Sequence, residues 1–224
     1  LLRRYPRPAD ILERGLDALV IEFKRISRGM LGIDRAKALH EAAKTSVGIQ
    51  EGSMGLIMEL QDLLASIEQC EHFVGQLEKE MSRCLQDIPY SKLLLSMKGI
   101  GEVTVAGLIG EVGDFRNFDN ISELLKYAGL NLYEISSGKK KGNRRISKRG
   151  RALMRKILFF AAVRTIRKGG IMHDHYQRYL QNGMKKVKAL VAVSRKLLGI
   201  MLALVRNHSL YEENYRKAGY LKAA

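Results

Sequence analysis

A serine beside a dense run of cations is the arrangement in this sequence most suited to chemistry. Ser137 follows Ser136 and precedes a glycine, and a basic run begins directly afterwards at position 139. A serine hydroxyl is a weak nucleophile at neutral pH, so its attack on a phosphodiester needs a base or metal ion, and cations that stabilise the transferring phosphoryl group. The cations are present, but no histidine lies near Ser137 in the sequence. The residues alone therefore favour a loop serine over a nucleophile.

The basic run indicates a polyanionic partner. Residues 139–188 contain 17 basic residues and one acidic residue, Asp174, while bases and acids cancel over the remainder of the chain. Solubility is served by interspersed charges of both signs, so an almost unmixed block favours nucleic-acid binding over a merely solvated surface. The predicted phosphate contacts are Lys139, Lys140, Lys141, Arg144, Arg145, Lys148, Arg149, Arg151 and Arg155.

A second candidate phosphate site is a pair of glycines, Gly99 and Gly101, that flank Ile100 between two apolar segments. This spacing is typical of a helix-hairpin-helix motif, which we predict over about residues 93–110. The glycines would let the turn approach a phosphate closely, and the N-terminus of the following helix would present free amide groups to it. An ordinary helical turn is the alternative, and Glu102 at the mouth of the turn counts against close phosphate contact.

Apolar residues recur in alternating steps of three and four between positions 60 and 88. This heptad seam predicts a coiled-coil helix over residues 57–88. The a positions are Leu60, Ile67, Val74, Met81 and Ile88, and the d positions are Leu63, Cys70, Leu77 and Cys84. The seam favours a homo-oligomer, a dimer or a tetramer, although the stripe could instead pack on another helix of the same chain.

The remaining hydrophobic pattern is also helical. Residues 1–56 are predicted to form a linker module of short helices interrupted by glycines, and residues 89–224 a helical C-terminal domain. Within that domain we expect a helix at 121–127, a basic loop and helix over 137–168, and a long helix at 184–205. The predicted fold is therefore all-α, with short N-terminal helices, a long coiled-coil helix and a helical C-terminal domain that contains the helix-hairpin-helix motif.

The sequence offers little for metals or membranes. His173 and His175 could share a metal ion, but no third ligand accompanies them, so surface histidines are the favoured interpretation. The longest apolar run, residues 197–205, is far shorter than the roughly 18 residues that a membrane span requires. Only two cysteines occur, which is typical of a reducing compartment, so we expect a cytoplasmic protein without membrane contact. The chain opens on Leu1, and we expect it to be part of a longer product.

Taken together, the motifs resemble insertion-sequence transposases of the 110/116/902 type, a group associated with bridge-RNA-guided DNA recombination. The resemblance covers nearly the whole chain. It is carried by Gly99–Gly101, by residues 115–130, by Ser137 and Gly138, by residues 146–150, by Arg155, Ala161 and Ala162, and by residues 189–198 with Arg195 and Lys196.

The resemblance implies that two domains share the chemistry. In that family an N-terminal domain with an RNase-H-like fold holds an acidic tetrad that binds Mg²⁺, a coiled coil joins protomers, and a helical C-terminal domain supplies a serine nucleophile. Ser137 matches that serine, so the resemblance reverses its interpretation as a loop residue. Attack by Ser137 on a DNA strand would give a transient phosphoserine linkage, followed by strand exchange and rejoining.

The chain also departs from the family pattern. It lacks a recognisable acidic tetrad, so we expect no cofactor in this part, Mg²⁺ in the missing N-terminal domain, and no activity from this chain alone. The expected partners are DNA and a guide RNA, at the nucleoid of a prokaryotic cytoplasm. Ser136 could be mistaken for the nucleophile, and Leu132 stands where the family often has proline.

Two other functional classes fit the same residues. A non-catalytic helix-hairpin-helix protein would bind branched DNA or structured RNA, and only covalent chemistry at Ser137 separates it from a recombinase. A coiled-coil assembly scaffold would form a dimer with no affinity for nucleic acid, so failure to bind DNA and RNA at low salt would favour it.

Overall fold

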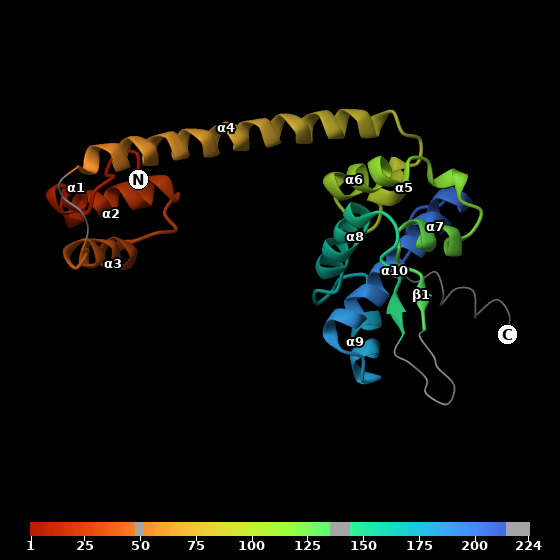
Figure 1. The fold of residues 1–224 in the computed structure, drawn as a ribbon. Coiled ribbons are helices and arrows are strands. Elements are labelled where there is room, and N and C mark those ends of the chain that lie inside the picture. The colour runs from red at the N-terminus through yellow and green to blue at the C-terminus, as the bar shows by residue number, and fades with distance from the viewer. Residues whose placement is uncertain (48–51, 135–143, 214–224) are drawn as a thin grey trace. The chain divides into compact units, whose positions relative to one another are not determined.

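The computed structural model describes residues 1–47, 52–134 and 144–213, and the chain divides into two compact units (Figure 1). One unit runs from Leu1 to Gln76 and the other from Leu77 to Ala224. Helices dominate the described residues of both units, which confirms the predicted helical fold class.

Three short helices and the first part of a long fourth helix build the first unit. Helices α1 (Pro8–Arg14), α2 (Leu16–Ile26) and α3 (Ile33–Lys44) pack on one another. Their buried apolar residues are Ile11, Leu19, Ala36 and Ala43. The breaks between helices fall at glycines, because Gly15 separates α1 from α2 at a φ of 78° and Gly32 caps the N-terminus of α3. The predicted glycine-interrupted short helices are therefore present.

The long helix α4 (Ser53–Gln86) carries the predicted heptad seam. The seam residues in the middle of the helix are exposed to solvent, and they are Leu63, Ile67, Cys70, Val74 and Leu77. The exposed fractions of the four aliphatic residues run from 44% at Leu77 to 54% at Leu63. Within the described part of the chain, this stretch of the seam is not buried.

The second unit is a helical bundle in which α10 (Lys186–Asn207) packs along α8 (Ala152–Thr165), and α8 packs along α6 (Glu102–Val112). The smaller elements are α5 (Ser91–Leu95), a 3-10 turn at Phe115–Asn117, α7 (Ile121–Tyr127) and α9 (His173–Gln181). The largest fully buried side chains of this unit include Leu108, Phe115, Leu124, Met154, Leu158, Leu197, Leu198 and Met201.

A glycine allows α6 and α8 to approach each other closely. A Cβ atom added to Gly107 would stand 2.9 Å from Cδ1 of Ile157, so the bare backbone of α6 accommodates this isoleucine of α8. The contact fixes α8 against α6 and thereby sets the position of the segment that leads into α8.

A short hairpin departs from the all-helical expectation. Strands β1 (Leu132–Tyr133) and β2 (Arg145–Ile146) pair antiparallel, with Leu132 opposite Ile146 and Tyr133 opposite Arg145. We predicted a loop here, because strands of two residues are too short to show an alternating pattern. The residues between the strands include 135–143, which lie outside the described part of the chain.

None of the described helices is both long enough and apolar enough to cross a membrane.

The burial of α8 predicts unequal effects for two leucines on the same helix. Leu158→Ala should lower the free energy of unfolding of the second unit by about 2–5 kcal/mol, because the side chain is fully buried and its removal leaves a cavity. Leu153→Ala is the matched control, since Leu153 is 53% exposed, and it should change the free energy by less than about 1 kcal/mol. Urea unfolding followed by circular dichroism measures both, and equal losses would contradict this packing.

Candidate nucleic-acid interface

Two segments far apart in the sequence cross at the base of the hairpin. Backbone hydrogen bonds join Ser147 N to Asn131 O at 2.9 Å, Lys148 N to Gly129 O at 3.0 Å, and Arg151 N to Tyr127 O at 3.2 Å. These bonds tie the C-terminal end of α7 to the residues that enter α8. We call this arrangement, formed by residues 127–131 and 147–151, the backbone crossing.

Glycines make the backbone crossing possible. Gly129 has a φ of 69°, and a Cβ atom there would stand 2.8 Å from the carbonyl oxygen of Arg149. Gly150 has a φ of 144°, and a Cβ atom there would stand 2.6 Å from the amide nitrogen of Gly129 and closer still to the carbonyl oxygen of Tyr127. Only glycine adopts these backbone angles at low cost and leaves room for such a close approach.

Arg155 fastens α8 to the backbone crossing. Its Nη1 donates hydrogen bonds to the carbonyl oxygens of Ala128 and Gly150, both at 3.0 Å. A second side-chain bond joins the two segments, because Ser147 Oγ donates to Asn131 Oδ1 at 2.5 Å. Arg155 is half-buried, and it donates both of these hydrogen bonds to backbone atoms, so it anchors α8 to the crossing.

A cavity of about 810 Å³ opens beside the backbone crossing. Its lining residues are Lys126, Tyr127, Asn131, Tyr133, Ser147, Arg149, Gly150 and Arg151. Three of these residues carry a positive charge and none carries a carboxylate. The cavity is therefore suited to an anionic ligand.

Arg151 and Tyr127 form one wall of the cavity. Arg151 Nε donates to the hydroxyl oxygen of Tyr127 at 3.0 Å, and its guanidinium carbon lies 5.6 Å from the centre of the tyrosine ring. The Tyr127 hydroxyl in turn donates to the carbonyl oxygen of Glu111 at 3.1 Å. The bond to Tyr127 raises the pKa of Arg151 above its ordinary value, so the guanidinium stays charged at every physiological pH.

Apart from Arg155, the predicted phosphate contacts separate into three groups. Arg149 and Arg151 line the cavity, whereas Arg144, Arg145 and Lys148 are exposed nearby. Arg144 Nε forms an ion pair with Glu134 at 3.0 Å where the hairpin leaves the described residues. The third group lies outside the described part of the chain and comprises the predicted nucleophile Ser137 and the predicted contacts Lys139, Lys140 and Lys141.

The glycine turn lies apart from the lining of this cavity. Gly99 has a φ of 91°, and a Cβ atom there would contact Cγ2 of Thr165 at 3.4 Å. Gly101 caps the N-terminus of α6 in an extended conformation, and Ile100 between the two glycines is buried. Glu102 in the first turn of α6 accepts a hydrogen bond from Ser82. The structure thus brings Gly99 to the C-terminal end of α8, and neither Gly99 nor Gly101 lines the cationic cavity.

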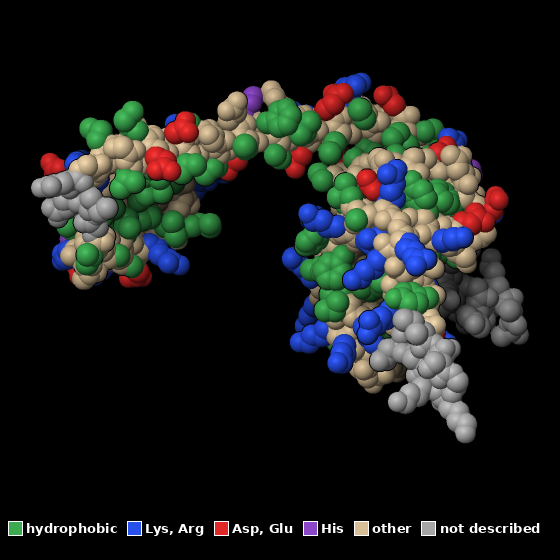
Figure 2. Space-filling model, in the orientation of Figure 1, with side chains coloured by type: hydrophobic (Ala, Val, Ile, Leu, Met, Phe, Trp, Pro, Cys, Tyr) green, Lys and Arg blue, Asp and Glu red, His purple; other side chains and the backbone are tan. Residues whose placement is uncertain are grey.

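Further cations extend the positive surface beyond the cavity. Figure 2 shows Lys and Arg side chains gathered over the visible face of the second unit, around α8. The exposed basic residues of α8, α9, α10 and their connections are Lys156, Arg164, Arg167, Lys168, Arg178, Lys185, Lys186, Lys188 and Arg206. The described residues contain no group of three or more His, Cys, Asp or Glu side chains that could hold a metal ion.

Six lining residues of the cavity were not predicted from the sequence, namely Lys126, Tyr127, Asn131, Tyr133, Ser147 and Gly150. Where these residues have side-chain partners, the partners are distant in the sequence: the bond from Ser147 to Asn131 spans 16 residues and the bond from Arg151 to Tyr127 spans 24. The one available signal was the pair of glycines at 129 and 150, which flank the region and whose roles appear only when the two segments meet.

Residues 91–177, which include the backbone crossing and the whole cavity lining, match the family described as Transposase IS116/IS110/IS902 family. The chain is 26% identical to the insertion element IS110 uncharacterized 43.6 kDa protein of Streptomyces coelicolor, over 95% of this chain and 52% of that protein. It is 23% identical to the insertion element IS116 uncharacterized 44.8 kDa protein of Streptomyces clavuligerus, over 94% and 53%. It is 29% identical to a pilin gene-inverting protein of Moraxella lacunata, over 66% and 46%. The chain therefore spans about half the length of these curated relatives.

The close approach of the backbone at Gly150 predicts that a larger residue there destabilises the second unit. Gly150→Ala should lower the free energy of unfolding of the second unit by about 2 kcal/mol or more, because the added Cβ would strain the backbone and collide with Gly129. Gly110→Ala in α6 is the matched control, since no atom lies within 4 Å of its added Cβ, and it should be neutral or stabilise by about 1 kcal/mol. Thermal unfolding compares the two, and a Gly150→Ala protein as stable as the control would refute the crossing.

Proposed function

Because residues 91–177 match the IS116/IS110/IS902 transposase family, we propose that this chain is the part of a DNA transposase that binds the DNA and supplies a serine nucleophile, Ser137. The observation that carries this proposal is the cationic, carboxylate-free cavity at the base of the hairpin. The proposed nucleophile belongs to the segment that joins the two strands of that hairpin. A phosphate bound in the cavity would thus contact residues that lie close to Ser137 in the sequence.

The proposed reaction is a reversible transesterification. Ser137 Oγ attacks the phosphorus of a phosphodiester, its proton passes to a base, and the bond from phosphorus to the leaving sugar oxygen breaks as that oxygen takes up a proton. The phosphoserine linkage retains the energy of the broken bond, so attack by a new sugar hydroxyl can rejoin a strand and release the serine. Arg149 and Arg151 would stabilise the charge on the transferring phosphoryl group.

The Mg²⁺ that the family resemblance implies has no fitting ligand set among the described residues. The proposal therefore assigns no step of this chain to a metal ion and places Mg²⁺ in the remainder of the full-length protein. By this assignment, the chain alone binds nucleic acid but does not cleave it.

A guide RNA would bind on the positive surface that continues beyond the cavity. The exposed cations of α8, α9 and α10 could neutralise a second phosphate backbone. Backbone contacts of this kind give affinity without sequence selectivity, so a guide would have to supply the choice of target by base pairing.

The alternative function is a non-catalytic protein that binds branched DNA or structured RNA through a helix-hairpin-helix motif. It is favoured by the turn between α5 and α6, in which Gly99 has a left-handed φ and Gly101 caps the next helix. Both functions require phosphate binding, and covalent chemistry at Ser137 distinguishes them.

The decisive experiment asks for a covalent adduct. The full-length protein is incubated with guide RNA, Mg²⁺ and labelled DNA junctions, then denatured and separated by electrophoresis. We expect an adduct with the unmodified protein and with Ser136→Ala, but none with Ser137→Ala, because only Ser137 would bond to phosphorus. An equal amount of adduct from Ser137→Ala would favour the non-catalytic function. The same conclusion would follow if no variant formed an adduct despite tight binding of the DNA.

We also propose that α4 joins two copies of the chain. The support for this is the solvent exposure of Leu63, Ile67, Val74 and Leu77, since a coiled coil buries such a stripe against a partner helix. A parallel arrangement would bring Cys70 of both copies together at a d position.

Charge substitutions on α4 test this association. Ile67→Lys with Val74→Lys should convert a dimer to a monomer in sedimentation, because the two lysines would be buried in the seam. Gln69→Lys with Gln76→Lys adds the same charges off the seam and should leave the mass unchanged. If the seam variant keeps the mass of the unmodified protein, the helix does not join protomers.

A further inference from the structure

The cavity beside the backbone crossing contains more than a phosphate site needs. Besides its cations, it is lined by two tyrosine rings and a side-chain amide, at Tyr127, Tyr133 and Asn131. We infer that this cavity binds one unpaired nucleotide of a nucleic-acid strand, with the base against Tyr133 and the phosphate against Arg149 and Lys126. The inference rests on the proposed binding of nucleic acid and specifies which part of the strand the site takes.

The phosphate half of the site consists of cations that are available to a ligand. Arg149 and Lys126 are exposed, and the side chain of neither makes a hydrogen bond or ion pair with another of the described residues. Arg151 adds a third charge. Its Nε donates a hydrogen bond to Tyr127 and lies 4.0 Å from a carboxylate oxygen of Glu111, and both interactions use only this nitrogen of the guanidinium group. The Nη donors of Arg151 therefore stay available for a phosphate oxygen.

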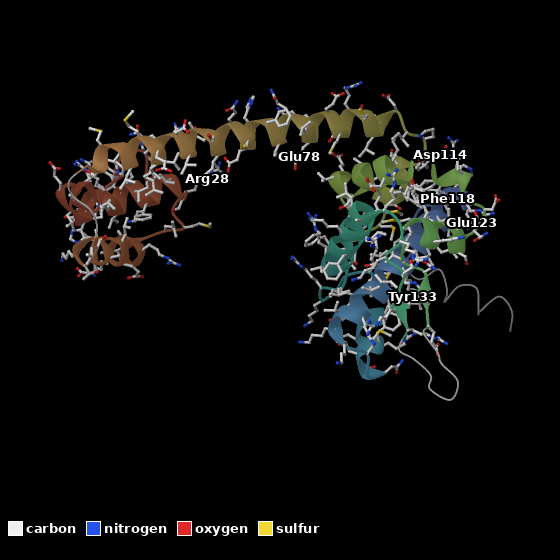
Figure 3. All side chains as sticks on the ribbon, viewed as in Figure 1. Arg28, Glu78, Asp114, Phe118, Glu123 and Tyr133 are labelled. Atoms are coloured by element: carbon white, nitrogen blue, oxygen red, sulfur yellow. The ribbon has the colours of Figure 1, made fainter. Side chains whose placement is uncertain are left out.

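The base half of the site is provided by Tyr133. This residue lies on β1 (Figure 3), is 42% exposed and lines the cavity. The ring of Tyr127 is already in contact with other side chains. The Arg151 guanidinium lies over one of its faces, and Phe118 packs against it in an edge-to-face arrangement with 5.4 Å between the ring centres. Tyr133 is thus the ring that can stack on a base.

Asn131 favours a base that can accept a hydrogen bond. Its Oδ1 already accepts a hydrogen bond from Ser147 Oγ, so the Nδ2 donors are what the amide offers to a ligand. A base edge with a carbonyl oxygen or an unprotonated ring nitrogen would satisfy them. Exposed edges of this kind occur on every base once it leaves its pair.

The size and shape of the site favour an unpaired nucleotide over a duplex. A cavity of about 810 Å³ falls within the range that holds single small ligands, and a nucleotide is of that class. In a duplex both faces of a base are covered by its neighbours, so stacking on Tyr133 requires a base that has left the helix or belongs to a single strand. DNA and RNA share this chemistry.

Fluorescence anisotropy of labelled oligonucleotides tests the inference with the chain described here. The probes are a fully paired duplex, the same duplex with one unpaired nucleotide, and single strands of DNA and RNA. Tyr133→Ala should weaken binding of the probes with unpaired nucleotides by about fivefold to 150-fold, the range expected for loss of one stacked base. Binding of the paired duplex should change by less than about twofold, because backbone contacts hold it.

Matched variants separate stacking from other effects. Tyr133→Phe keeps the ring and should bind like the unmodified chain, whereas Phe160→Ala removes an exposed aromatic ring outside the cavity and should have no selective effect. Comparison of the DNA and RNA probes identifies which strand the site prefers. Equal weakening of paired and unpaired probes by Tyr133→Ala would overturn the inference while the proposed function stood. Failure of every probe to bind the unmodified chain would overturn both.

A cross-linking measurement on the unmodified chain does not depend on the folding of any variant. A 5-iodouridine placed at the unpaired position should cross-link on irradiation to Tyr133, and peptide mass spectrometry would locate the bond. A cross-link only to residues outside the cavity lining would overturn the inference, whatever the affinities of the variants.

Discussion

The candidate site depends on one backbone crossing that Arg155 and two glycines hold in place. Gly129 and Gly150 let the two segments approach within contact distance, and Arg155 bonds a carbonyl oxygen from each of them. Lys126 reaches the site from α7 and Arg151 from the start of α8, so their shared cavity exists only while the crossing holds these elements together. The close packing of Ile157 of α8 on Gly107 of α6 is a steric contact, and it holds α8 in the position that the crossing requires.

The second consequence of this architecture is electrostatic. The crossing places three cations around one cavity that has no carboxylate in its lining. The cations repel one another, and an anionic ligand would relieve this repulsion. Tyr127 offsets part of this cost, because its ring and hydroxyl hold the Arg151 guanidinium. Arg149 and Lys126 have no such compensation among the described residues. An anion that enters the cavity should therefore stabilise the fold as well as bind to it.

The sequence predicted the helices well and the cavity poorly. Helix 121–127 was predicted to the residue, and the long helix predicted at 184–205 is found at Lys186–Asn207, because periodic apolar residues report local structure directly. The family was also recognised correctly from dispersed motifs. The hairpin was missed, since its pairs join residues 12 or more positions apart, such as Tyr133 and Arg145. Arg155 was predicted to contact phosphate, but no local pattern reveals that its partners are backbone carbonyls of a distant turn. The proposed role of Ser137 stays a prediction.

The hydrogen bonds of Arg155 determine which residues of this region can be replaced without loss of the fold. Its bonds go to the carbonyl oxygens of Ala128 and Gly150, and every amino acid carries such an oxygen. Most side chains around the crossing can then be exchanged without loss of the anchor, whereas the arginine and the glycines cannot. A protein built this way can alter the side chains that line its cavity while it keeps one fold.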